Sequence, residues 1–259
     1  KDGQRKDYFA WQMSTTGAIL DSNSASDGEE WIAMSLLFAS ARWGNGDGIY
    51  NYKREAQNIL NAMLSKTEKS DSPLIVTNMF NKAKKQVVFV PIGNADYFTD
   101  PSYHVPHFYE LWGRWADRNR DFWLAAADSS RKYLRKVVHP KTGLAPDYSH
   151  FEGTPIDPPW GGGHDAFRFD AWRVAMNIAI DYLWFKKEEW AVAQSNKLLD
   201  FFAKEGLDKY VNQYTLDGKR LSNDRNGGLV AMNAVAAMAS TNPNKAEFVK
   251  ELWNLPIPT

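Results

Sequence analysis

The chain has 259 residues, which suits one large domain or two small ones. Its 31 Lys and Arg residues balance its 31 Asp and Glu residues, and this zero formal charge argues against sequence-independent nucleic-acid binding and against a membrane surface as the main partner. The lack of cysteine excludes disulfides, thiolate metal sites and a cysteine nucleophile. The 11 Trp, 11 Tyr and 14 Phe residues suit a cleft that binds the apolar faces of a ligand.

The chain begins Lys1-Asp2-Gly3, with neither an initiator methionine nor an apolar signal sequence. We therefore expect it to start inside a longer protein. The composition fixes no compartment, so a bacterial periplasmic, extracellular or cytoplasmic location stays open. No run of about 18 apolar residues is present, and no membrane span is expected.

The dominant period in the sequence is helical. Apolar residues recur at intervals of three and four from Trp31 onward, after a cap predicted at Ser26 with Glu29 three residues later. The same periodicity predicts further helices over 52–64, 106–116, 120–137, 169–185, 188–203, 228–239 and 244–253. One strand is predicted over 86–92, and long loops over 3–25, 65–100 and 142–165.

The short links between neighbouring helices predict antiparallel helix pairs. No change of composition marks a domain boundary, so residues 1–259 are expected to form a single domain. Long loops favour a closed ring of helix pairs over an open solenoid, because a ring gathers its loops at one mouth. No repeat of about 34 or 40 residues is present, which disfavours the simple solenoid families.

Several kinds of chemistry lack their sequence signatures. The run Gly161-Gly162-Gly163 is not followed by the Lys-Ser/Thr pair of a phosphate-binding loop. His104 and His107 have a spacing compatible with a metal, but Pro106 lies between them and no carboxylate stands at a telling offset. No Gly-x-Ser-x-Gly is present. We expect neither a metal nor a cofactor.

Two carboxylates each allow two interpretations. Asp27 stands at the start of an apolar helix, where it could serve as a cap or favour the helix dipole. Asp170 opens another helix three residues before Arg173, which predicts a simple ion pair. Alternatively, the arginine keeps Asp170 ionised so that this carboxylate can receive a proton from water. Local chemistry alone does not decide between these interpretations.

The segment from Ala25 to Trp43 resembles the helix signature of glycoside hydrolase family 8. It reads Ala25-Ser26-Asp27-Gly28-Glu29, then Ile32-Ala33, Ser35-Leu36-Leu37, Ala39 and Trp43. It departs once, with Glu29 where Asp is usual. Further segments match the family in the same order: Tyr8-Phe9-Ala10-Trp11, Asp100-Pro101-Ser102-Tyr103, Gly143-Leu144-Ala145-Pro146-Asp147-Tyr148 and Asp170-Ala171-Trp172-Arg173-Val174. The resemblance covers essentially the whole chain and is greatest to the branch that releases xylose from the reducing end of xylo-oligosaccharides.

The resemblance implies an all-α fold, the (α/α)6 barrel, present here as an incomplete central portion without its N- and C-terminal helices. It also implies an inverting hydrolase of β-1,4-linked glycans. Such enzymes place an acid and a base on opposite sides of the scissile bond, about 6.5–9.5 Å apart. Asp170 matches the family's general base, Arg173 the arginine beside it, and Asp27 the aspartate that holds the sugar at the cleaved bond.

Four other residues are expected to bind substrate. Trp11 and Tyr103 match residues beside the cleaved sugar, and Tyr148 lies in a matching motif. The reducing-end branch closes its cleft with a His-Pro loop before a late helix, and the stretch 224–227 stands in that place without the His or the Pro. Arg225 in this stretch could hydrogen-bond a terminal sugar hydroxyl.

The family's general acid is a Glu in a segment that precedes the counterpart of Tyr8, and the residues before Tyr8 contain no glutamate. Glu29, Glu110 and Glu152 are unconvincing substitutes. We therefore expect the 259-residue chain by itself to be inactive, with missing segments or a second chain completing the barrel.

Three other functions stay open from the sequence. The first is an endo-acting β-1,4-xylanase or β-glucanase of the same family, because loops set substrate choice more than the barrel does. The second is a non-catalytic glycan-binding relative that has lost the acid. The third, a helical interaction scaffold, is opposed by Asp27, Asp170 and Arg173 occurring together at the family's spacing.

Overall fold

The computed structural model describes residues 5–66 and 76–256. The start of the expected loop 3–25 and the middle of the expected loop 65–100 lie outside the described residues. The chain divides into two compact units. Unit 1 holds residues 1–99 and 108–129, and unit 2 holds residues 100–107 and 130–259. The single domain expected for 1–259 stays a prediction.

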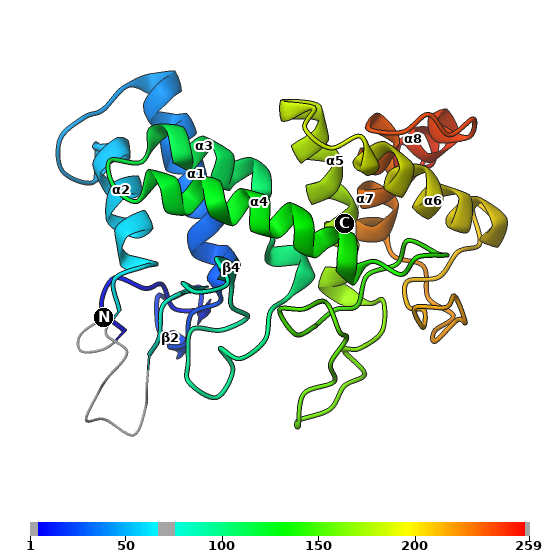
Figure 1. Cartoon of the computed structure of the whole chain (residues 1–259), viewed down its shortest axis with the longest axis horizontal. Helices are drawn as coiled ribbons and strands as arrows, with labels where there is room; N and C mark the ends of the chain where they lie inside the picture. The colour runs from blue at the N-terminus through cyan, green and yellow to red at the C-terminus, as the bar shows by residue number, and fades with distance from the viewer. Residues whose placement is uncertain (1–4, 67–75, 257–259) are drawn as a thin grey trace. The chain divides into compact units, whose positions relative to one another are not determined.

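Unit 1 is built around a helix pair and two short hairpins. Helix α1 packs against α2 (Figure 1). The elements that lie wholly in this unit are β1 (Gln12–Met13), β2 (Ile19–Asp21), α1 (Ser26–Trp43), a 3₁₀ turn (Gly48–Tyr50), α2 (Tyr52–Ala62), β3 (Phe80–Asn81) and β4 (Gln86–Val87). The part of α3 (Pro106–Trp115) from residue 108 onward and the part of α4 (Arg120–Val137) up to residue 129 also belong here.

An aromatic cluster forms the core of unit 1. The Phe80 ring meets the rings of Tyr109 and Trp123 edge-on, with centroids 5.3 Å and 5.2 Å away. Trp112 packs against Trp123 in the same way, at 4.9 Å. All four side chains are essentially excluded from water. This packing fixes β3 against the residues of α3 and α4 that belong to this unit.

The capping predicted at the start of α1 is wrong. The N-cap is Ala25, which makes no side-chain hydrogen bond with any described residue, and Ser26 is already helical. Glu29 Oε1 accepts the backbone N–H of Phe9 at 2.7 Å. The buried glutamate thus satisfies a backbone donor of the segment that precedes the helix.

The expected strand over 86–92 is shorter in the structure. Residues Gln86–Val87 pair with Phe80–Asn81, and Ile92 makes a separate bridge to Val76. The β1–β2 hairpin lies inside the predicted loop 3–25 and was not expected. Its strands are two and three residues long, which leaves too little alternation for a sequence pattern to reveal.

Unit 2 is a group of helices with an aromatic and aliphatic core. In Figure 1, α7 lies beside both α5 and α8, and α6 packs on α5. The helices are α5 (Arg173–Phe185), α6 (Trp190–Glu205), α7 (Gly227–Met238) and α8 (Lys245–Trp253). Their shared core includes Phe202, Tyr210, Tyr214, Leu229 and Phe248. The observed bounds of α6, α7 and α8 agree with the predicted helices to within about two residues, the usual scatter at helix ends.

The predicted helix over 169–185 begins four residues later than expected. Phe169–Trp172 forms a 3₁₀ turn, here η4, and regular helix starts at Arg173. The cause is Phe169, whose φ of 41° lies in the left-handed region that an α-helix cannot use. A second 3₁₀ turn, η3 (Pro101–Tyr103), is capped by Asp100, whose Oδ1 accepts the N–H of Ser102 at 2.7 Å. These two turns carry the residues described next.

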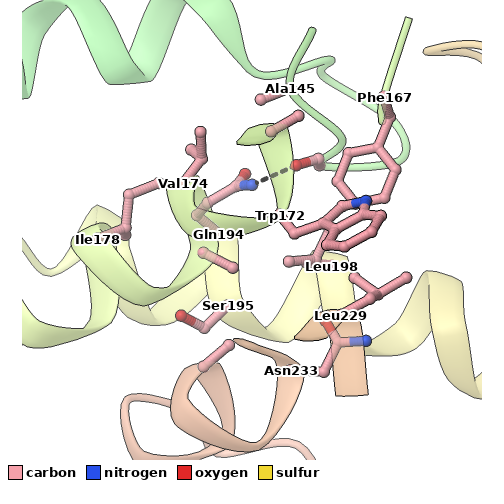
Figure 2. Close-up of a pocket in the computed structure, with 14 residues that line it drawn as sticks. Ala145, Phe167, Trp172, Val174, Ile178, Gln194, Ser195, Leu198, Leu229 and Asn233 are labelled. Carbon is pink, nitrogen blue, oxygen red and sulfur yellow. Dashed lines mark hydrogen bonds between the residues drawn. The ribbon is translucent and has the colours of Figure 1, made fainter. Parts of the chain in front are cut away.

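A small void lies inside unit 2, between α5, α6 and α7 (Figure 2). Apolar side chains line most of it, including those of Trp172, Leu198 and Leu229. The dashed line in Figure 2 is the hydrogen bond from Gln194 Nε2 to the carbonyl oxygen of Gly143, 2.7 Å long. The void measures about 10 Å³, which is room for at most one water molecule and none for a sugar. It is part of the core. In residues 5–66 and 76–256, no helix combines the length and apolar character needed to cross a membrane.

Candidate active site

The base predicted from the sequence lies on η4 in unit 2. The Asp170 side chain is about half exposed, at 52%. Its Oδ2 lies 2.9 Å from Nη2 of Arg173, one turn further on. The predicted ion pair is therefore present, and Arg173, which is itself three quarters covered, leaves the carboxylate open to solvent on its remaining sides. A carboxylate held in this way suits proton transfer from a water molecule.

Tyr103 on η3 belongs to the same group. The guanidinium carbon of Arg173 lies 5.5 Å from the centroid of the Tyr103 ring, a cation–π contact. Tyr103 is 4% exposed, so its ring cannot offer a broad stacking face to a ligand. Any contact with substrate is limited to the edge of the ring. The structure thus brings together three of the expected residues, Asp170, Arg173 and Tyr103.

Two buried carboxyl groups surround this ion pair. Burial raises the pKa of Asp100 well above its ordinary value; the carboxylates of Asp147 and Asp170 act in the same direction and Arg173 in the opposite one. Burial also raises the pKa of Asp147, to about 6, against the opposing effect of its hydrogen bond with His164. The folded protein therefore favours a proton on Asp100, which limits the negative charge near Asp170.

Asp147 is held on both of its oxygens. Oδ2 lies 2.6 Å from Nδ1 of His164, and Oδ1 accepts the N–H of Ala171 at 3.3 Å. The His164 ring stacks on the Tyr148 ring with centroids 4.2 Å apart and planes 10° from parallel. Tyr148, also expected at the site, therefore lies next to the carboxyl group that contacts the turn of Asp170.

Backbone pairing in the loops holds these side chains in place. The N–H of Asp147 donates to the carbonyl of Ala166, and the N–H of Tyr148 donates to that of His164, both at 2.9 Å. Phe167 and Tyr214 exchange two backbone hydrogen bonds, at 2.9 Å and 3.0 Å. The long predicted loop over 142–165 is thus fastened at the point where η4 begins.

The other two expected residues near the cleaved sugar belong to unit 1. Asp27 is the second residue of α1 and is half-buried. Trp11 is 65% exposed, so its indole face is open for stacking. The backbone N–H of Trp11 donates to the carbonyl of Asn23 at 2.6 Å. Two residues earlier in the chain, Phe9 bonds to Glu29. The segment that carries the exposed Trp11 indole is thus bonded, through Phe9 and Glu29, to α1, the helix that carries Asp27.

Arg225 is already engaged within unit 2. Its Nη2 lies 2.7 Å from Glu251 and 3.0 Å from the carbonyl oxygen of Leu207, and its guanidinium lies over the Tyr210 ring. These contacts fix the loop before α7. Arg225 can bond a sugar hydroxyl only if these contacts rearrange or if an N–H group of the guanidinium that they do not use faces the sugar.

Two of the glutamates considered as a replacement acid have buried side chains. Glu29 and Glu110 are 1% and 4% exposed. Glu29 bonds to the backbone of Phe9, and Glu110 pairs with Arg114 at 3.4 Å. Neither can reach a glycosidic oxygen in these positions. Glu152 is exposed on the loop before η4.

The two histidines with metal-like spacing are buried. Burial lowers the pKa of His104 and of His107 to about 3, so both rings are neutral. His104 hydrogen-bonds Ser130 and stacks on Tyr133, while His107 meets the edge of Trp184. No group of three or more metal-ligating side chains occurs in the part of the chain that the structure describes.

Three residues of the cluster were not singled out from the sequence: Asp100, Asp147 and His164. The first two lie inside segments that carry the family resemblance, so a signal was present there. His164 stands in no motif. The triple glycine before it was interpreted as a plain turn, yet a side chain at Gly162 would come within 2.6 Å of His164 Nε2. The glycine makes room for the imidazole.

Comparison with known proteins gives a consistent family. The model of "Glycosyl hydrolases family 8" matches residues 3–254. The chain is 41% identical over 259 residues to the reducing-end xylose-releasing exo-oligoxylanase Rex8A of Paenibacillus barcinonensis, covering 99% of this chain and 66% of that protein. It is 39% identical to the reducing end xylose-releasing exo-oligoxylanase of Halalkalibacterium halodurans, covering all of this chain and 65% of the relative. The chain thus spans about two thirds of the length of these relatives.

Solved structures agree with the sequence matches. The crystal structure of a GH8 xylobiose complex from Teredinibacter turnerae is 44% identical, with a TM-score of 0.94 over 98% of this chain and 66% of that one. The expected fold, a portion of the helical (α/α)6 barrel, is confirmed by this similarity. The chain therefore belongs to glycoside hydrolase family 8.

Proposed function

We propose that this chain is the central part of an inverting glycoside hydrolase that cleaves β-1,4-xylosidic bonds and releases xylose from the reducing end of xylo-oligosaccharides. The single observation that carries the chemistry is the ion pair between Asp170 and Arg173, whose charged atoms lie 2.9 Å apart. The Asp170 side chain is about half exposed, and it interacts with the buried carboxyl groups of Asp100 and Asp147. The substrate class is supported by three curated relatives, 36–41% identical, that are named reducing-end xylose-releasing exo-oligoxylanases.

In the proposed reaction, Asp170 is the general base. It takes a proton from a water molecule whose oxygen attacks the anomeric carbon, while an acid on the other side of the bond protonates the departing oxygen. The C–O bond to the leaving sugar breaks as the new C–O bond forms, and the configuration inverts. Arg173 orients the carboxylate, and its guanidinium lies over the ring of Tyr103.

Four residues are proposed to hold the substrate. Asp27 accepts hydrogen bonds from hydroxyls of the sugar whose bond is broken, and Trp11 stacks on an apolar sugar face. Tyr148 contacts the sugar from the base side. Arg225 bonds a hydroxyl of the terminal sugar. Hydrogen bonds of this kind accelerate the reaction to the extent that they tighten in the transition state.

The general acid is expected from a segment that the resemblance places before Tyr8. We therefore expect the 259-residue chain by itself to release no xylose, because a poor leaving group departs slowly without a proton donor. The measurement is xylose release from xylohexaose by a purified chain of verified mass. Release at a rate typical of glycosidases would contradict the expectation and would mean that another residue of this chain supplies the proton.

An endo-acting xylanase is the second candidate. A second Teredinibacter turnerae structure, also 44% identical, is described as a GH8 catalytic mutant xylohexaose complex xylanase. The stretch 224–227 also keeps this candidate open, since it lacks the His and the Pro that the resemblance leads us to expect in the reducing-end branch.

One assay separates the candidates. Xylotriose to xylohexaose, labelled at the reducing end, are incubated with the intact gene product and sampled over time. Labelled xylose as the first product supports the exo-acting proposal. A spread of labelled dimers and trimers at the earliest time would establish the endo-acting alternative, and tight binding without any cleavage would indicate a glycan-binding relative.

A further inference from the structure

The imidazole of His164 lies in a slot built from three sides. Its Nδ1 lies 2.6 Å from Asp147, its face stacks on Tyr148, and Gly162 leaves room beside Nε2. The side chain is 15% exposed. Gly162 has a φ of 118°, which side-chain-bearing residues rarely adopt, so both backbone and space require glycine there. Such close fitting fixes the orientation of the ring.

Asp147 connects this imidazole to the turn of the base. Its Oδ1 lies 3.3 Å from the N–H of Ala171, the residue that follows Asp170. The same N–H also donates to the carbonyl of Arg168 at 2.9 Å. The turn is therefore closed by backbone hydrogen bonds and supported by one carboxylate. A shift of Asp147 would change the position of the peptide on which the base is mounted.

Tyr148 stacks on the imidazole and is one of the residues proposed to bind substrate. Burial raises the pKa of the Tyr148 phenol, and the carboxylates of Asp147, Asp100 and Asp170 act in the same direction. The ring is backed by His164 at 4.2 Å. Without that support the phenol could turn away from a bound sugar.

We propose that His164 is a positioning residue for the active site, with two separable actions. Its Nδ1–H holds Asp147 and, through it, the turn that carries Asp170. Its ring face holds Tyr148 against the substrate. The inference rests on the proposed function of Asp170 as the base. It predicts that the two actions affect different kinetic constants, because one supports the reacting group and the other supports ground-state binding.

Two variants separate these actions. His164→Phe keeps a ring to stack on Tyr148 but removes the N–H donor to Asp147. His164→Asn keeps an amide N–H near the position of Nδ1 but removes the stacking face. His139→Asn is the matched control, since His139 hydrogen-bonds Thr142 through Nδ1 and is outside the acidic cluster. All are measured in the intact gene product with xylohexaose, together with melting temperatures.

The expected result is a crossed pattern. His164→Phe lowers kcat about tenfold with KM within about twofold, since displacement of a reacting group by a fraction of an ångström is costly. His164→Asn raises KM about fivefold with kcat within about threefold, since a stacking support is lost. His139→Asn leaves both constants near those of the parent protein.

The failures are distinguishable. If the parent protein hydrolyses xylohexaose but both His164 variants keep its kcat and KM, the positioning role is overturned and the proposed function stands. Equal losses in both constants for both variants, with lowered melting temperatures, would show a purely structural histidine and would also overturn the role. If the parent protein cleaves no glycan, the proposed function itself fails and this inference fails with it.

Discussion

The two units present their expected site residues in contrasting surroundings. In unit 2, Asp170 lies among other ionisable groups: Arg173, Asp100, Asp147 and His164. In unit 1, Asp27 lies at the start of α1, and the segment before that helix carries the widely exposed indole of Trp11. The contrast indicates a division of labour. We propose that the unit 2 residues serve proton transfer and that the unit 1 residues hold a sugar by shape and hydrogen bonds.

The largest loss of activity should come from substituting Asp170 in unit 2. Asp170→Asn removes the proton acceptor, and we expect kcat of the intact gene product to fall at least about a hundredfold, since a positioned base contributes about 10²–10⁴-fold. The melting temperature should change little because the side chain is half exposed. Steady-state kinetics on xylohexaose measure the effect.

Asp165→Asn is the matched control, an exposed carboxylate in the loop just before η4, and it should retain the parent rate. Near-normal turnover in Asp170→Asn would show that Asp170 is not the general base. The proposed contrast between the two units would then fail as well.

A smaller loss is expected on the sugar-holding side. Asp27→Asn should lower kcat/KM about 10- to 100-fold, the range for losing a hydrogen bond to a charged group. Its stability should fall only by the small helix-dipole contribution of about 0.3–1 kcal/mol. The control is Asp121→Asn. Asp121 is an exposed acidic residue in the first turn of α4, so its substitution loses the same helix-dipole stabilisation without changing a proposed site residue.

Kinetics and thermal unfolding of both variants decide the point. A large stability loss in Asp27→Asn with intact activity would mean that Asp27 serves the helix rather than the sugar.

The smallest effect concerns the buried carboxyl of Asp100, whose pKa burial raises. A raised pKa means that the folded wild type keeps a proton that the unfolded chain releases above pH 4. Wild-type stability therefore falls, through this group alone, as the pH rises above about 4. Asp100→Asn keeps an oxygen to cap Ser102 but has no proton to retain, so it should gain in relative stability from pH 4 to pH 7.

Denaturant unfolding at pH 4, 5.5 and 7 measures this difference. A relative stability that instead falls with rising pH would show that Asp100 is ionised and held by Arg173.

Much of the helical frame could be predicted from the sequence. The bounds of α4 agree residue for residue with the periodic pattern, because a strongly amphipathic helix carries its signal in every turn. The start of α1 could not be predicted in detail. Its apparent cap, Ser26 with Glu29, depends on where the glutamate side chain points, and that is decided by the distant segment at Phe9.

The charged cluster was predicted in part for a related reason. Asp170 and Arg173 lie one turn apart, so their pairing follows from local geometry. The contact between Asp147 and His164 joins residues 17 apart across a loop. No local pattern reports such a contact. The left-handed Phe169 is equally invisible in sequence, because most residues with a large side chain avoid that conformation.

The exchange of Asp for Glu at position 29 has a geometric consequence. The Glu29 carboxylate reaches across to the N–H of Phe9 at 2.7 Å, and its extra methylene adds about 1.5 Å of reach over an aspartate. An aspartate there would have to draw the Phe9–Trp11 segment closer to α1 or lose the bond. One carbon atom therefore acts as a spacer that sets how far the exposed indole of Trp11 stands from the helix that carries Asp27.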